Sequence, residues 1–126
     1  MSSWGVRLAG LVSVVILLLG VRAFLDPVAA SASFGLPMHS AAETAFVRVY
    51  GARNAMLGAV ALTLAARGMV RPLVPLFMLA TCLPLLDAVV IVSRVGLGPE
   101  LTRHAIILAV LASISIALWR SPQARA

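Results

Sequence analysis

The stretch LAGLVSVVILLLGV, residues 8–21, contains no charged residue, and Arg7 and Arg22 stand at its two ends. With its flanks it covers residues 4–25, which is long enough to cross about 30 Å of hydrocarbon at about 1.5 Å per helical residue. Ala30-Ser31-Ala32 resembles a signal-peptide cleavage site, but it lies beyond Arg22 and Asp26. We therefore expect residues 4–25 to be a retained membrane helix.

Three further apolar segments of similar length follow, at residues 42–66, 72–95 and 101–119. None alternates strictly between apolar and polar residues, as the strands of a membrane β-barrel do. Lipid cannot satisfy exposed peptide groups, so the segments are expected to be helices. The prediction is an all-α fold, an integral membrane four-helix bundle forming one domain over residues 1–126.

The composition agrees with a membrane protein and excludes several other classes. Of 126 residues, 62% are hydrophobic and 11% are charged, and the mean hydropathy is +1.08. A disordered tail, a nucleic-acid-binding domain and nearly any soluble enzyme of this size are excluded. The net charge of +6 comes from arginines spread along the chain, which indicates contact with lipid headgroups and no nucleic-acid partner. The lone Cys82 excludes a thiol pair for redox chemistry.

The distribution of charge predicts the orientation. The arginines on one side of the predicted membrane have no acidic residue beside them, whereas those on the other side are balanced by three carboxylates. The first set is Arg7, Arg67, Arg71, Arg120 and Arg125; the second is Arg22, Arg94 and Arg103 with Asp26, Glu43 and Glu100. The positive-inside rule places both termini in the cytoplasm, with Trp4 and Trp119 at the inner interface of the inner (cytoplasmic) membrane of the cell.

Local signals predict where helices begin, bend and end. Asp26-Pro27 should end the first helix, and residues 28–40 read as a small, flexible connection. Ser40 and Glu43 have the spacing of a capping box, and Gly68 suits the end of the second helix. Pro84 should kink the third helix by freeing the carbonyl of Ala80.

Two opposite charges lie inside the predicted spans, where each is costly. Arg53 should lie about 15 Å below the outer surface and Asp87 about 10 Å below it. An Arg53–Asp87 ion pair in the outer half of the bundle would offset both costs. Arg48 lies nearer the outer surface and is expected to extend its guanidinium outward.

The second predicted helix combines a polar face with a small-residue face. Helical spacing places Glu43, Tyr50, Arg53 and Asn54 on one side. Small residues, including Gly51, Ala55 and Gly58, lie beside that face and favour close helix packing. His39 and His104 are expected to serve as caps or headgroup contacts instead of ligating haem or a metal, so no cofactor and no metal are predicted.

The pattern Gly51-Ala52-Arg53-Asn54 with Gly58, preceded by Phe34-Gly35-Leu36-Pro37 and followed by Asp87, resembles a family of small four-span membrane proteins with a domain of unknown function. Its members occur in bacteria and fungi. A looser similarity reaches small membrane proteins of fungal polyketide pathways that are assigned to epoxide opening. That similarity implies a reaction at Arg53 and Asp87.

Three functions fit these residues. The first is a membrane enzyme that acts on a small lipophilic molecule, for which an epoxide fits best. This enzyme would use Asp87 as base, Arg53 to orient Asp87, and Asn54 to hold water. Tyr50 or Glu43 would donate to the oxygen. A proton-coupled exporter is an alternative, although the intramembrane carboxylate of small four-span exporters lies in their first helix. The third possible function is that of a structural or accessory membrane subunit, in which the Arg53–Asp87 pair is purely structural. A homodimer is compatible with each of the three functions.

Overall fold

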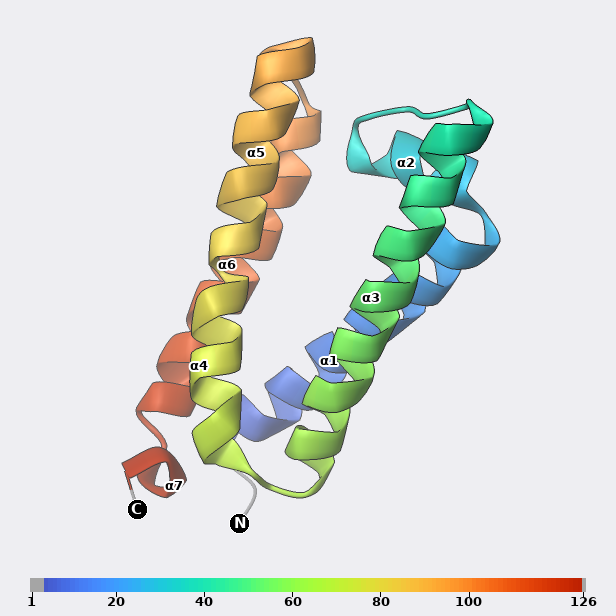
Figure 1. The fold of residues 1–126 in the computed structure, drawn as a ribbon. Coiled ribbons are helices and arrows are strands. Elements are labelled where there is room, and N and C mark those ends of the chain that lie inside the picture. Colours follow the sequence, from blue (N-terminus) through green and yellow to red (C-terminus); the bar gives the residue numbers. More distant parts are fainter. Residues whose placement is uncertain (1–3, 126) are drawn as a thin grey trace. The chain divides into compact units, whose positions relative to one another are not determined.

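The computed structural model describes residues 4–125. Within them every regular element is a helix: α1 (Trp4–Leu25), α2 (Pro27–Phe34), α3 (Ala41–Ala66), α4 (Val70–Ala80), α5 (Cys82–Val95), α6 (Glu100–Trp119) and α7 (Pro122–Arg125). Figure 1 traces these helices along the chain. The predicted all-α class is confirmed.

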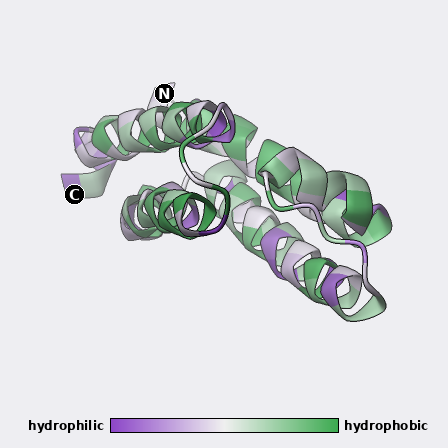
Figure 2. Cartoon of the chain, turned by 90° about the horizontal axis from the view of Figure 1, so that it is seen from above, coloured by the Kyte–Doolittle hydropathy of each residue, from purple (hydrophilic) through white to green (hydrophobic). Residues whose placement is uncertain are grey.

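Four helical segments are long and apolar enough to cross a membrane: α1, α3, α6, and α4 and α5 together over Val70–Val95. Most of their large apolar side chains are exposed, including Leu18, Phe46, Leu86 and Ile106. Figure 2 shows the hydrophobic colouring running along the helices. Outward apolar side chains are expected where the surrounding solvent is lipid. The protein is therefore a multi-pass membrane protein.

The chain divides into two compact units, each of which is described by itself. One unit is Gly10–Thr63; the other combines the described parts of Met1–Ala9 and Leu64–Ala126. The first, here called the N-unit, holds most of α1, α2 and most of α3. The second, the C-unit, holds α4 to α7 with the first residues of α1.

In the N-unit, glycines bring the backbones of α1 and α3 into direct contact. A Cβ added at Gly20 would lie 2.4 Å from the amide nitrogen of Ala55. One added at Gly58 would lie 2.6 Å from the amide nitrogen of Leu17. Because these neighbours are backbone atoms, no side-chain rotation can make room. Gly51, Ala55 and Gly58 thus form the expected packing seam, with α1 as its partner.

The connection between α1 and α3 is more ordered than its composition predicted. Residues expected to be flexible form α2, because Asp26 caps the helix by accepting a 3.2 Å hydrogen bond from Ala29 N–H. Pro27 occupies the first turn, where its missing N–H costs nothing. Gly35 ends α2 with φ of 104°, a conformation that glycine adopts readily.

The C-unit packs α6 against both α4 and α5, and α7 against α4 and α6. Its most buried large side chains are Leu73 and Phe77 of α4, Ile91 of α5 and Leu118 of α6. The break between α4 and α5 falls at Thr81, next to the carbonyl of Ala80 that Pro84 cannot bond. The interruption falls where Pro84 was expected to disturb the helix, and the kink itself stays a prediction.

The close contact between α1 and α3 predicts that replacing a helical glycine by alanine lowers the stability of the protein, the opposite of the usual effect. Gly20→Ala should destabilise the protein by about 1–3 kcal/mol through overpacking, although alanine normally favours a helix interior over glycine by about 1 kcal/mol. Thermal unfolding in detergent, followed by circular dichroism, measures the difference. Gly98→Ala is the matched control, because its Cβ would meet only the mobile end of Glu100. Equal unfolding temperatures for the two variants would contradict the close α1–α3 contact.

Candidate functional site

The capping box at the start of α3 engages Glu43. Its Oε2 accepts hydrogen bonds from Ser40 N–H at 3.0 Å and His39 N–H at 3.2 Å. Ser40 Oγ accepts one from Glu43 N–H at 3.2 Å. The carboxylate also lies in the first turn of α3, where the helix dipole favours a negative charge. The predicted capping box is confirmed, and it gives Glu43 a structural role beside its predicted catalytic one.

Arg48 caps a neighbouring helix. Its Nη1 donates a 2.7 Å hydrogen bond to the carbonyl oxygen of Phe24, one of the last carbonyls of α1, which have no N–H donor within the helix. An arginine at a helix C-terminus also interacts favourably with the helix dipole. The Arg48 side chain is exposed, as expected from its position near the outer surface. Its charged group also hydrogen-bonds the end of α1.

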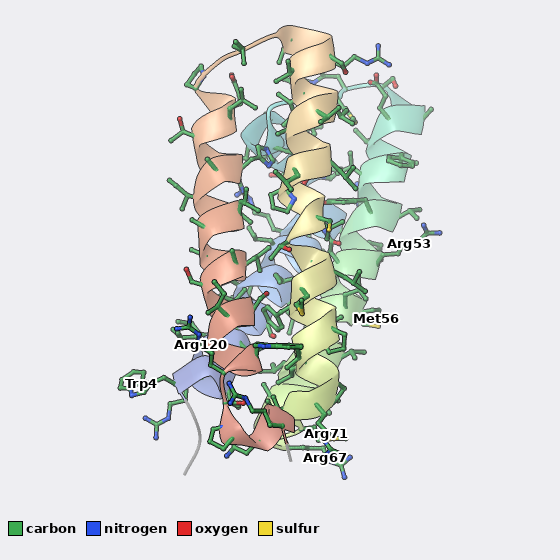
Figure 3. The ribbon with its side chains drawn as sticks, turned by 90° about the vertical axis from the view of Figure 1, so that its left-hand side faces the viewer. Trp4, Arg53, Met56, Arg67, Arg71 and Arg120 are labelled. Atoms are coloured by element: carbon green, nitrogen blue, oxygen red, sulfur yellow. The ribbon has the colours of Figure 1, made fainter. Side chains whose placement is uncertain are left out.

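The remaining predicted residues of the N-unit lie along α3. The ring of Tyr50 meets the ring of Phe34 edge to face, with centroids 6.4 Å apart. Arg53 is exposed, and Figure 3 shows its guanidinium pointing away from α3. It lines a hollow of 470 Å³ with Ala52, Met56 and Leu57. Asn54 is half-buried on the same helix.

In the C-unit, Asp87 of α5 faces His104 of α6. The Oδ2 atom of Asp87 lies 3.9 Å from Nδ1 of His104. The His104 side chain is only 4% exposed, whereas the Asp87 side chain is 34% exposed. The separation exceeds a direct hydrogen bond. The two side chains form a polar pair between two membrane helices.

Sequence reasoning missed this partnership. His104 was expected to serve as a cap or a headgroup contact. Two signals could have found it: His104 is only four residues into α6, so its depth is about 6 Å, close to that of Asp87. Moreover, α5 and α6 are joined by a short connection and must be neighbours. The Arg53–Asp87 pair joins residues of different units and stays a prediction.

The described residues contain no group of three or more His, Cys, Asp or Glu side chains that could hold a metal ion. The Asp87–His104 pair offers two potential ligands, and a metal needs more from the protein or from water. The arrangement instead suits acid–base chemistry, because a carboxylate and an imidazole can exchange one proton at this separation after a small movement.

Comparison with protein families assigns the chain. Residues 13–119 match the model of a domain of unknown function, DUF4267, so the chain belongs to that family. No curated protein and no solved structure matches it. The expected resemblance to a family of unknown function is confirmed. The matched range includes every predicted site residue and His104.

The Asp87–His104 contact predicts energetic coupling. Asp87→Asn and His104→Gln should show a combined effect on unfolding free energy that differs from the sum of the single effects by about 0.5–3 kcal/mol. A double-mutant cycle from denaturation in mixed micelles measures this coupling. The cycle between Asp87→Asn and Ser40→Ala is the control, since Ser40 bonds Glu43 instead. Additive effects in the first cycle would show that the two side chains do not interact.

Proposed function

We propose that this protein binds a small lipophilic molecule within the membrane and opens an epoxide ring by adding water. The observation that carries the proposal is the Asp87–His104 pair, an acid–base couple between two membrane helices with its atoms 3.9 Å apart. Ionisable residues inside membrane spans are costly and commonly mark functional sites. The exposed part of Asp87 gives a ligand in the lipid a route to the pair.

The proposed reaction starts with Asp87 ionised and His104 protonated. Asp87 accepts a proton from water as the water oxygen forms a bond to one epoxide carbon. The bond between that carbon and the ring oxygen breaks, and His104 donates a proton to this oxygen. The product is a diol. Asp87 then passes its proton to His104, which restores the starting state without any other reactant.

This proposal differs from the sequence-based assignment in the acid. Tyr50 or Glu43 was expected to protonate the epoxide oxygen, with Arg53 orienting Asp87 and Asn54 holding water. His104 takes the donor role here because it belongs to the same unit as Asp87 and lies beside it. Glu43 already accepts two hydrogen bonds from backbone amides, which favours its structural role.

Turnover of lipophilic epoxides in ¹⁸O-labelled water tests the reaction. Purified protein in lipid nanodiscs should produce a diol carrying one labelled oxygen. Asp87→Asn and His104→Gln should each lower turnover by about 100-fold or more, because each removes one partner of the proton transfer. Glu100→Gln is the matched control, since it removes one carboxylate at the start of α6, and it should retain activity.

Two outcomes would contradict the enzyme proposal. If folded protein turns over no epoxide of the panel, epoxide opening is excluded for those substrates. If Asp87→Asn retains full turnover, the base is another residue. Proton-dependent efflux of a lipophilic dye from proteoliposomes, lost in Asp87→Asn, would instead indicate an exporter. Unchanged function after reciprocal exchange of Arg53 and Asp87 would indicate a structural pair.

We also propose that the protein lies in the inner membrane of a bacterium with both termini in the cytoplasm. The support is the group of arginines and tryptophans at one end of the C-unit. Figure 3 shows Trp4, Arg67, Arg71 and Arg120 toward that end. The guanidinium carbon of Arg7 lies 5.7 Å from the ring centroid of Trp4, within range of a cation–π interaction.

Reporter fusions test this orientation. A fluorescent protein that folds in the cytoplasm should be active at either terminus, and alkaline phosphatase, which requires the periplasm, should be inactive there. Both termini are expected in the cytoplasm because arginine-rich segments that flank membrane helices stay on the cytoplasmic side. Alkaline phosphatase fused after Gly98, in the connection between α5 and α6, is the control and should be active. Phosphatase activity at the C-terminal fusion would reverse the proposed orientation.

A further inference from the structure

The C-unit contains a cavity of 530 Å³ near the start of α4. It is lined by Arg71, Val74 and Pro75 of α4, Trp119 of α6, and Ala124 and Arg125 of α7. It therefore combines two guanidinium groups, an indole ring and an apolar wall. None of these residues belongs to the Asp87–His104 pair, so the cavity is independent of the proposed reaction.

A sharp turn after α6 builds the cavity. Ser121 is buried, and its Oγ donates a 2.7 Å hydrogen bond to the carbonyl oxygen of Leu118. The N–H of Ser121 donates to the same carbonyl at 3.1 Å. Pro122 then begins α7, which lies against α4. The turn thus brings Arg125 to the cavity that Arg71 lines from the second position of α4.

The charge of the cavity is uncompensated within the described part of the chain. No carboxylate of residues 4–125 forms an ion pair with Arg71 or Arg125. Glu100, at the opposite end of α6 from Trp119, lies about 28 Å away along the helix. The N-terminus of α4, where no side chain caps the amides, adds the positive end of a helix dipole. The cavity therefore favours an anion.

The lining also indicates what the anion carries. Guanidinium groups bind phosphate oxygens through paired hydrogen bonds. Trp119 has an apolar ring and a polar N–H, a combination that suits the membrane interface. Val74 and Pro75 continue from Arg71 along α4, so an apolar chain attached to the phosphate would meet apolar side chains. A free phosphate would leave that wall unused.

We propose that this cavity binds the phosphate group of an anionic phospholipid. Arg71 and Arg125 bind the phosphate oxygens, Trp119 covers the headgroup, and the first turns of α4 contact the acyl chain. Basic pockets beside membrane helices on the cytoplasmic side are suited to such lipids. Binding here would join α7 to α4 and stabilise the end of the C-unit.

Fluorescence of Trp119 tests the proposal. The sequence has two tryptophans, so Trp4→Phe leaves Trp119 as the single indole reporter. Protein in detergent is titrated with brominated phosphatidylglycerol or brominated phosphatidylcholine, which quench the indole on contact. Phosphatidylglycerol should quench at lower concentration. Arg71→Gln and Arg125→Gln should each weaken its half-saturation about fivefold, as expected for one arginine near an anionic lipid.

Matched variants separate a site from general surface charge. Arg7→Gln and Arg67→Gln remove the same charge from residues that do not line the cavity, and they should change the half-saturation less than twofold. Arg71→Lys retains the charge without the paired donors and should recover only part of the binding. Circular dichroism of each variant verifies that the helices are retained, so a loss of binding is measured on folded protein only.

Two results would overturn the proposal. Equal losses in the cavity variants and the matched variants would mean that lipid attraction is unspecific. Inorganic phosphate at millimolar concentration that relieves quenching, where sodium chloride of equal ionic strength does not, would mean that a soluble phosphate compound is the ligand instead of a lipid. Persistent quenching by phosphatidylglycerol under both salts would support the lipid.

Discussion

Hydrocarbon offers no hydrogen-bond partner to a peptide group, and this constraint governs the chain from end to end. It makes every apolar segment helical, and it makes each helix end a place where orphan N–H and C=O groups need partners. The structure supplies them with nearby polar side chains. Arg48 serves the carbonyl of Phe24, Asp26 serves an amide of α2, and Glu43 serves the amides of His39 and Ser40.

The same constraint explains why glycine is used where α1 meets α3. Helices in lipid gain little from hiding apolar side chains, because lipid is equally apolar, so close packing has to supply the attraction. Gly20, Gly51 and Gly58 let the two backbones touch. The seam leaves the polar residues of α3 on other faces. Packing and chemistry can therefore share one helix without competing for the same positions.

Charges divide into two classes in this protein. Those at helix ends cap backbone groups or meet the interface, and they would be expected in almost any membrane protein. Asp87 and His104 differ, because they face each other between α5 and α6, within the predicted membrane spans. The cavity beside Arg71 and Arg125 differs too, since a turn in the chain assembles it. These two places are where a ligand would find groups that structure alone does not require.

The sequence by itself determined the all-α class, the membrane spans, the capping box at Ser40 and Glu43, and the break near Pro84. Each depends on hydropathy or on residues within one helical turn, which are local quantities. The helix α2 was not predicted, although its capping residues Asp26 and Gly35 are also local signals. The partnership of Asp87 with His104 and the meeting of Arg71 with Arg125 at one cavity were decided only by tertiary structure. Rotation of each helix about its axis depends on packing against its neighbours, and a single sequence does not encode that rotation in any local pattern.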